Sequence, residues 1–361
     1  MTVLHIIDTL DVGGAERLLV GAIQGMPAVK HHVITLADRA KLAGELPAGC
    51  KLISLGFTGK WDAISCIRRI RKYIKQNQVD IVHSHLVLSN IIARLATPPN
   101  VPLINSIHTI NSPRFYRNFF SAARWAEKIT YRKRHTLIAV SQVVLEDYKK
   151  HIGLKGKAVV LYNFVEDRFF SDHPREYINN GILRMVAVGT LKPAKNYEFL
   201  LNAFRQVPVG VTLSIYGDGP LREALQQMAA DIPSVRFEGS HAHIEQVFKQ
   251  YDLFVMSSHY EGHPVALMEA ASAGIPALVP DIPTLKEALN NQGLYFRAND
   301  QKDFLTTVEL ILNGSVDINK YATHNWQFAA NNARKQQYVE KLMGLYRELI
   351  RPEAKLPGSS N

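Results

Sequence analysis

The sequence predicts an α/β protein in which two domains follow one another, each a parallel sheet covered by helices. At 361 residues the chain is longer than one ordinary domain, so two are expected. Short apolar runs of strand type alternate with helical patterns, which is typical of parallel sheets. The alternation stops at the polar, turn-rich segment 163–181 and then resumes, which predicts a linker there.

The first half contains predicted strands at residues 3–8, 32–36, 80–85, 103–108, 137–141 and 158–162. Residues 61–75 between them predict a helix, because isoleucines recur at helical spacing opposite basic residues. The second half contains predicted strands at residues 183–189, 211–217, 235–239, 252–258 and 276–280. A long amphipathic helix is predicted from Trp326 through Tyr346.

These elements predict a first domain over 1–170, a second over 171–325 and a C-terminal helix over 326–350. Ligands of such folds bind at the carboxyl ends of the strands. We therefore expect a binding cleft between the two domains, with functional residues that follow strands.

The sequence gives no indication of a secreted, membrane-spanning, disulfide-rich or zinc-binding protein. The opening segment MTVLHIID reads as a first strand and not as a signal peptide, and no run reaches the roughly 18 apolar residues of a membrane span. Cys50 and Cys66 lack the spacing of a disulfide framework or a zinc site. We expect a protein of the reducing cytoplasm.

The net charge of +10 is concentrated in the first half of the chain. Through residue 175 there are 25 Lys and Arg against 13 Asp and Glu, whereas the remainder has 17 against 19. The segments 68–75 and 114–134 supply much of the excess. This asymmetry predicts an anionic partner for the first half: a membrane surface, a phosphorylated substrate or nucleic acid.

Glu261 and Glu269 stand eight positions apart in EGHPVALMEAASAGIPALV, residues 261–279. Glu261 follows a predicted strand and precedes a helix that Pro264 can open and Gly274 can close. The amides at that helix start could hold hydroxyl or phosphate oxygens, and Glu269 suits a vicinal diol such as a ribose. A helix-start glutamate and a structural salt bridge are the alternative, but the whole strand–turn–helix pattern favours a ligand site.

A second strand–turn–helix junction lies at VGTLKPAKNYEFLLNAF, residues 188–204. Lys192 and Lys195 lie in a short loop before a helix whose predicted N-cap is Asn196. Two ammonium groups beside a helix start suit a diphosphate, although a solvated lysine pair is an equally good interpretation. In a third junction, GDGPLREAL at 217–225, the glycines could do no more than make the turn.

In the first half, Gly13 and Gly14 join the first predicted strand to a helix. Paired glycines let a ligand phosphate approach the backbone, or they simply form a turn. His108 ends a predicted strand, where binding residues are expected, although a lone histidine is more often structural. His83 and His85 point to one face of their strand, but no third metal ligand suggests itself, so no metal site is assigned.

With these residues in place, the chain resembles glycosyltransferase family 4, the retaining nucleotide-sugar transferases with the GT-B architecture of two facing Rossmann-like domains. The resemblance covers nearly the whole chain, including a tryptophan-bearing C-terminal helix that in the family crosses back to the first domain. It rests on GGAE at 13–16, VDIVHSH at 79–85, IAVS at 138–141, LYNFVED at 161–167, GDGP at 217–220 and the Glu261/Glu269 pair.

The resemblance implies a role for each site residue. Lys195 would bind the diphosphate of the donor, Glu261 and the amides that follow it would hold the sugar hydroxyls, and Glu269 would hold the ribose. The implied catalytic residues are His108, Lys195 and Glu261. The implied donor-binding residues are Gly13, Gly14, Thr190, Lys192, Lys195, Glu261, Gly262, His263, Val265 and Glu269. The leaving phosphate itself is expected to take the acceptor's proton, so no cofactor, metal ion or enzymic nucleophile is implied.

Three positions depart from the family pattern. Thr190 stands where the family usually has an arginine that contacts the diphosphate, and His263 stands where an apolar aromatic residue is common. The segment 281–289 lacks the diglycine usual before its glutamate, here Glu287. These differences leave the identity of the donor open.

The acceptor is expected on the basic first domain. Basic and aromatic residues mix between Arg114 and Trp125, as in a segment at a membrane interface, and an ordinary helix with buried aromatics is an equal alternative. Arg114, Arg117 and Trp125 are the expected acceptor or membrane residues. The implied reaction moves a hexose from a UDP-sugar to a saccharide or lipid-linked acceptor, in the cytoplasm or at the inner face of an anionic membrane.

Two other classes stay open. A nucleotide-sugar epimerase can share this architecture and would need no acceptor, but the glutamate pair favours the transferase. A basic nucleic-acid-binding protein without catalysis is the other, yet no recognised nucleic-acid module is present and the second half is not basic, so no nucleic acid is expected.

Overall fold

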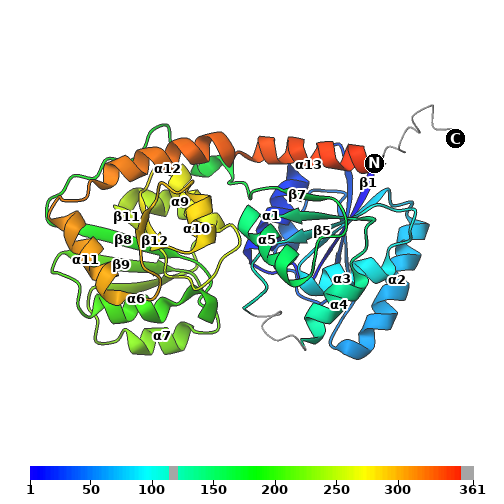
Figure 1. The fold of residues 1–361 in the computed structure, drawn as a ribbon, viewed down its shortest axis with the longest axis horizontal. Coiled ribbons are helices and arrows are strands. Elements are labelled where there is room, and N and C mark those ends of the chain that lie inside the picture. The colour runs from blue at the N-terminus through cyan, green and yellow to red at the C-terminus, as the bar shows by residue number, and fades with distance from the viewer. Residues whose placement is uncertain (114–120, 351–361) are drawn as a thin grey trace. The chain divides into compact units, whose positions relative to one another are not determined.

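The computed structural model describes residues 1–113 and 121–350. The chain divides into two compact units, which we call the first and the second unit. The first unit comprises residues 1–139 and 148–161 and the chain from residue 336, and the second comprises residues 140–147 and 162–335. Each unit has one parallel sheet with helices packed on it, so the predicted α/β class is confirmed (Figure 1).

In the first unit, the described residues form a seven-stranded sheet in the order β3-β2-β1-β4-β5-β6-β7. Its strands are β1 (Thr2–Ile7), β2 (Lys30–Thr35), β3 (Lys51–Ser54), β4 (Ile81–His85), β5 (Leu103–Ile107), β6 (His135–Ala139) and β7 (Ala158–Val160). The helices are α1 (Gly14–Gln24), α2 (Ala63–Gln76), α3 (Val87–Ala96), α4 (Ala122–Thr130) and α13 (Lys335–Ile350). Helix α5 (Gln142–His151) is divided, with residues 142–147 in the second unit and the rest in the first. The order reverses between β1 and β4, and at such a point a crevice for ligands opens at the strands' carboxyl ends.

In the second unit, the sheet has the order β10-β9-β8-β11-β12-β13. Its strands are β8 (Leu183–Val188), β9 (Val211–Tyr216), β10 (Val235–Gly239), β11 (Leu253–Val255), β12 (Ala277–Pro280) and β13 (Leu294–Phe296). The helices are α6 (Tyr197–Phe204), α7 (Arg222–Met228), α8 (Ile244–Val247), α9 (Val265–Ser272), α10 (Pro283–Ala288), α11 (Gln301–Leu312) and α12 (Ile318–Asn332). Here the order reverses between β8 and β11.

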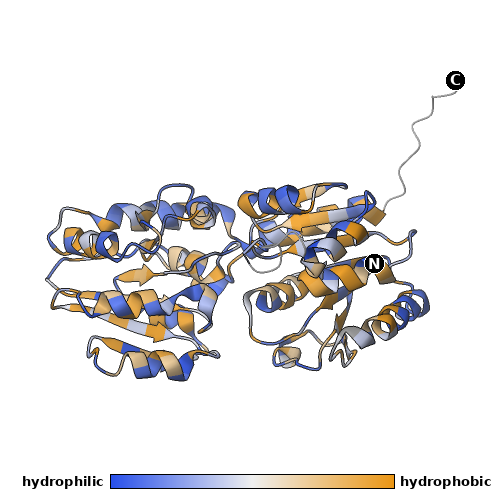
Figure 2. Cartoon of the chain, turned by 60° about the horizontal axis from the view of Figure 1, so that its bottom comes forward, coloured by the Kyte–Doolittle hydropathy of each residue, from blue (hydrophilic) through white to orange (hydrophobic). Residues whose placement is uncertain are grey.

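Short 3₁₀ turns complete the chain, at Ala43–Glu45, Lys60–Asp62, Asp167–Phe169, Pro193–Lys195 and Phe248–Gln250. The strands are predominantly hydrophobic and the helices carry a hydrophilic side, as Figure 2 shows. The reason is that a parallel sheet is covered on both faces, so its inner strands are apolar throughout. None of the described helices has the length and apolar character needed to cross a membrane.

Two edge strands, β3 and β13, were not among the predicted strands. Both are short, and β3 begins with an exposed lysine, so neither shows a sustained apolar run. The predicted single helix from Trp326 through Tyr346 was wrong, because α12 ends at Asn332 and α13 begins at Lys335. Between them Arg334 forms a β-bridge with Val165, and the amide of Val165 donates to the carbonyl of Ala333.

The segment 163–181, the predicted linker, packs on the second unit. The amide of Ser171 donates to the carbonyl of Ser272, and that of Arg175 donates to the carbonyl of Gly274. The final helix α13, from Gln336 on, belongs to the first unit. Its Tyr346 is fully buried there against β4.

Candidate functional site

The second unit brings Lys195 and Glu261 together. Lys195 lies in the loop after β8 and Glu261 in the loop after β11, and these two strands are paired neighbours at the reversal of strand order. The ammonium Nζ of Lys195 donates to Oε1 of Glu261 at 2.6 Å. Both side chains are largely sheltered, with exposed fractions of 15% and 13%.

Hydrogen bonds connect the two loops that carry Lys195 and Glu261. The hydroxyl of Ser258 donates to the same Oε1 of Glu261 at 2.7 Å. The hydroxyl of Ser257 donates to the backbone carbonyls of Lys195 and Asn196, at 3.0 and 2.8 Å. The amide of His259 donates to the carbonyl of Ala194 at 2.9 Å. The loops that carry the ion pair are therefore fixed by hydrogen bonds, as a preorganised binding group requires.

The glycines of GDGP do more than make a turn. Gly217 has a φ of +142°, and a Cβ added there would lie 2.0 Å from the carbonyl oxygen of Gly189. A Cβ on Gly219 would lie 2.5 Å from the carbonyl oxygen of Leu191. The amide of Leu191 in turn donates to the carbonyl of Asp218 at 2.9 Å. This turn supports the lysine loop by close backbone packing, which only glycine allows.

The helix after the lysine loop starts where it was predicted. Asn196 precedes α6 in the left-handed conformation, with φ of 52°, but its side chain makes no capping bond. Its amide nitrogen instead donates to Oδ1 of Asn299 at 3.2 Å. Burial, with the charge of Glu261 added, raises the pKa of Tyr197, whose hydroxyl donates to the carbonyl of Gly189. Lys195, Tyr197, Ser257 and Ser258 line a small pocket.

Helix α9 carries the second glutamate of the pair. Pro264 is its N-cap and not its first residue, so the helix begins one position later than predicted, at Val265. Gly274, with φ of +79°, closes it as predicted, and the amide of Ile275 donates back to the carbonyl of Ala270. Glu269 lies on this helix and is partly buried.

His263, in the turn before α9, is a packing residue. Its ring centroid lies 5.2 Å from that of Tyr162, and burial lowers the pKa of its imidazole to about 4. Its backbone carbonyl accepts from Nδ2 of Asn163 at 2.7 Å. The segment LYNFVED thus supports the turn that carries Glu261, whereas the neighbouring Gly262 is buried in it.

The other expected residues of the lysine loop, Thr190 and Lys192, are exposed. Leu191 between them is fully buried and anchors the loop in the core of the second unit. The loop therefore presents alternate side chains outward.

In the first unit, the paired glycines differ in what they do. Gly13 is the extended N-cap of α1, and a Cβ there would lie 2.3 Å from Oε2 of Glu16. A Cβ on Gly14 would meet no atom within 4 Å. A Cβ on Gly13 would meet only the carboxylate end of Glu16, a flexible group that can move aside, and the open space at Gly14 is available to a ligand.

His108 follows β5 directly and does not stand alone. Its Nε2 lies 3.1 Å from Nδ1 of His85, at hydrogen-bond distance. Burial lowers the pKa of His108 to about 4, so its ring is neutral at physiological pH. A neutral imidazole can donate or accept one hydrogen bond at each nitrogen.

Of the expected acceptor residues, Arg114 and Arg117 lie outside the described residues. Trp125 lies on α4 with 41% of its surface exposed. The ammonium of Lys128 lies 5.7 Å from its ring centroid.

Sequence reasoning missed three contributors to this site, namely Ser257, Ser258 and Tyr197. The two serines follow β11 after one intervening residue, Met256, and position after a strand was a signal that could have found them. Tyr197 is the first residue of α6 and reads as an ordinary core aromatic.

Comparisons with known proteins identify relatives of this chain. Residues 12–169 match the family model Glycosyltransferase Family 4, and residues 183–314 match the model Glycosyl transferases group 1. The putative glycosyltransferase EpsF of Bacillus subtilis is 25% identical over 79% of this chain and 80% of its own length. An Escherichia coli UDP-Gal:alpha-D-GlcNAc-diphosphoundecaprenol alpha-1,3-galactosyltransferase is 26% identical over 77% of this chain and 78% of its own.

Among solved structures, Anabaena HepE in complex with UDP and glucose has a TM-score of 0.81 at 17% identity, over 96% of this chain and 100% of the other. That likeness concerns the fold. The two family models together cover both units, and the homologues are named glycosyltransferases. The chain is therefore a glycosyltransferase of the GT-B type, with a family 4 domain followed by a group 1 domain.

Proposed function

We propose that this glycosyltransferase moves a hexose from a UDP-sugar to a saccharide or lipid-linked acceptor, with retention of the anomeric configuration. The observation that carries the proposal is the Lys195–Glu261 pair at the carboxyl ends of β8 and β11. A cation and an acceptor-only carboxylate side by side suit a ligand that carries both a diphosphate and hydroxyl groups.

Each end of the donor has its own residues in this proposal. Lys195, with Lys192 and Thr190 in the same loop, binds the diphosphate. Glu261 and the backbone amides of Gly262, His263 and Val265 hold the sugar hydroxyls. Glu269 accepts from the ribose hydroxyls. In the first unit, Gly13 and Gly14 form the loop that a phosphate can approach, and Gly14 has open space for it.

The chemistry needs stabilisation of a leaving group. The bond between the anomeric carbon and the phosphate oxygen breaks, and the acceptor oxygen forms a bond to that carbon from the same face. The acceptor's proton goes to the departing phosphate oxygen. Lys195 stabilises the charge that develops on the diphosphate, as preorganised donors do in other transfer reactions.

No enzymic nucleophile takes part in this scheme. Glu261 is engaged by Lys195 and Ser258, which suits a hydrogen-bonding role and not a covalent one. His108 is the catalytic residue proposed in the first unit. Its neutral ring can hold a sugar hydroxyl without adding a positive charge.

The acceptor side rests on the surface of the first unit. Helices α2, α3 and α4 and the 3₁₀ turn before α2 expose large apolar side chains, which are Trp61 in the turn and Ile64, Leu95, Trp125 and Ile129 in the helices. Trp61 and Ile64 accompany the basic residues of α2, a combination that suits an anionic membrane surface. The E. coli relative's name specifies a diphosphoundecaprenol acceptor. We therefore propose peripheral contact with the inner face of the membrane and a lipid-linked acceptor.

A thermal-shift screen against nucleotide sugars tests the donor assignment, since a ligand of the folded state raises the melting temperature. We expect UDP-hexoses to stabilise the wild type, Glu269→Ala to weaken that binding with the fold intact, and Lys195→Ala to slow turnover about 100-fold or more. If both variants kept the wild-type affinity for the nucleotide sugar and the wild-type turnover rate, the assignment of the donor site would be refuted. Interconversion of the free nucleotide sugar without an acceptor would favour the epimerase.

A further inference from the structure

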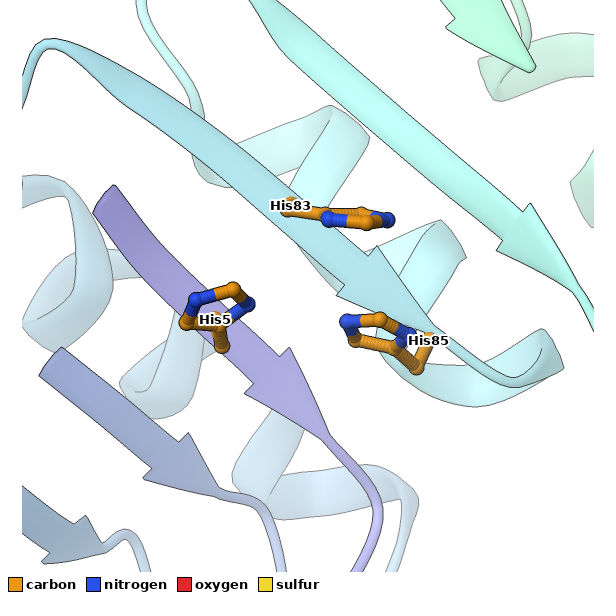
Figure 3. A group of neighbouring side chains, drawn as sticks. All are labelled: His5, His83 and His85. Carbon is orange, nitrogen blue, oxygen red and sulfur yellow. The ribbon is translucent and has the colours of Figure 1, made fainter. Parts of the chain in front are cut away.

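Three histidines of the first unit converge in its sheet. His5 comes from β1, and His83 and His85 come from β4. One ring nitrogen of each lies within 4.8 Å of the others, and the three rings point into the same space, as Figure 3 shows. The exposed fractions of these residues are 1%, 0% and 3%.

The strand pairing explains the convergence. β1 and β4 are neighbours at the reversal of strand order, and in their register His5 lies opposite His83. Since side chains alternate along a strand, His85 points to the same face as His83. The sequence suggested only the pair on β4, because His5 becomes their neighbour only through the parallel register.

Two nitrogens in this group lack any hydrogen-bond partner among the described residues. They are Nδ1 of His5 and Nε2 of His85. Buried polar atoms are rarely left unpaired, so each such atom calls for an explanation, of which an ion is one. These two atoms belong to different strands and to the same cluster.

The opposite nitrogens of the same rings are held by neighbours. Nε2 of His5 lies 3.1 Å from Nδ1 of His31, and Nδ1 of His85 lies 3.1 Å from Nε2 of His108. Histidines that ligate a metal nearly always hydrogen-bond through their other nitrogen, which fixes the ring's orientation and tautomer. The cluster has this outer support in place.

His83 supplies the third nitrogen. Its Nε2 contacts Ser106 of β5 at 2.8 Å, on the side of β4 that faces away from β1. Its Nδ1 contacts the hydroxyl of Tyr346 on α13 at 2.7 Å. A bound ion would therefore take Nδ1 and replace its direct hydrogen bond to the tyrosine hydroxyl.

We propose that His5, His83 and His85 bind one divalent transition-metal ion, with Zn²⁺ the best match, and that the hydroxyl of Tyr346 completes the site. Three imidazoles and one oxygen form a usual tetrahedral Zn²⁺ environment, and imidazole also suits Ni²⁺ and Cu²⁺ but not Mg²⁺ or Ca²⁺. The site is structural, because it joins β1, β4 and α13 within one unit. The proposed sugar transfer does not use the ion itself, and the site adjoins the proposed catalytic residue His108 through His85.

Metal content is the direct test. The full chain, without a polyhistidine tag, is stripped with a chelator, reloaded with Zn²⁺, dialysed and analysed by elemental mass spectrometry. We expect about one Zn²⁺ per chain in the wild type. In His5→Gln and in His85→Gln we expect a loss of affinity greater than the roughly 10- to 100-fold that substitutions of outer-shell partners cause. His135→Gln is the matched control, because His135 is also a buried strand histidine with an unpartnered Nε2 but lies outside the cluster.

A second readout needs no variant. In the stripped wild type, saturating Zn²⁺ should raise the melting temperature by about 5 °C or more, while Mg²⁺ should not. Co²⁺ in place of Zn²⁺ should show the intense visible absorption of a tetrahedral ion. Absence of both stoichiometric Zn²⁺ and thermal stabilisation would overturn the proposal. An equal loss of zinc in His135→Gln would also overturn it, since the ion would then not depend on the cluster.

Discussion

Replacing Glu261 by Gln should separate affinity for UDP from turnover. In the ligand-free protein Lys195 donates to Glu261 at 2.6 Å, and both side chains are at most 15% exposed. A diphosphate that approaches Lys195 must compete with this carboxylate. The substitution keeps the size of the side chain and removes the competing charge.

The burial of the pair sets the size of the effect. Exposed ion pairs contribute about 0.2–1 kcal/mol, whereas hydrogen bonds to charged groups contribute about 1.5–3 kcal/mol. At 15% and 13% exposure the pair lies between these cases, at about 1–2 kcal/mol. Because 1.4 kcal/mol is a factor of ten, Glu261→Gln should bind UDP about 5- to 30-fold more tightly.

Turnover should move in the opposite direction. If Glu261 holds the sugar hydroxyls, its loss removes a charged hydrogen bond near the reacting carbon, and the rate with a UDP-sugar should fall about 100-fold. Titration calorimetry with UDP and initial rates with the UDP-sugar measure the two effects separately.

The control is Glu198→Gln, which makes the same charge change at an exposed position on α6, close in sequence to the lysine loop. It should leave both quantities near those of the wild type. The reasoning is refuted if Glu261→Gln weakens UDP binding as much as Lys195→Ala does, because Glu261 would then only hold the lysine in place.

Three further predictions concern the scaffold. Glu127→Gln should lower the free energy of unfolding by about 3–5 kcal/mol and the melting temperature in calorimetry by about 10 °C. The reason is that the 2.6 Å ion pair with Arg94 has no exposed surface, so the buried guanidinium would lose its counter-charge. A loss under about 1 kcal/mol would contradict this. Gly217→Ala should weaken UDP binding about 10-fold or more and leave the circular dichroism spectrum unchanged. The reason is that the added Cβ would collide with the backbone at Gly189, next to the lysine loop. Wild-type affinity for UDP would argue against the support role of this turn. The pKa of His263 is about 4 in the folded protein and about 6.5 in the unfolded chain, so the unfolded state binds more protons between these pH values. The free energy of unfolding should therefore fall as the pH drops from about 6.5 to 4. Urea titrations should show a smaller fall with pH in His263→Gln than in the wild type, and an equal fall in both proteins would count against this prediction.

The sequence could predict the sheets and the ends of the strands because these depend on local patterns. Inner parallel strands are apolar throughout, so their positions and the residues after them, including Lys195 and Glu261, can be found without a structure. Gly274 could be assigned as a helix stop because a left-handed residue there favours glycine.

What could not be predicted depends on contacts between distant segments. His83 lies beside His5 because of the register between β1 and β4, and it contacts Tyr346 because α13 packs on the sheet. No local sequence pattern encodes either contact. The packing of Gly217 on Gly189 likewise follows from the pairing of β8 with β9. The break between α12 and α13 comes from a bridge to Val165, far away in the sequence.

The place of α13 also bears on how the chain folds as it is synthesised. The residues of the second unit end at Lys335, so all of them have been synthesised before α13 is complete. The first unit, whose strands are made earliest, must wait for α13 to cover Nδ1 of His83 with the hydroxyl of Tyr346. Since domains tend to fold in the order of synthesis, the half that begins first should reach its native state last, and until then its central strands are open to chaperones.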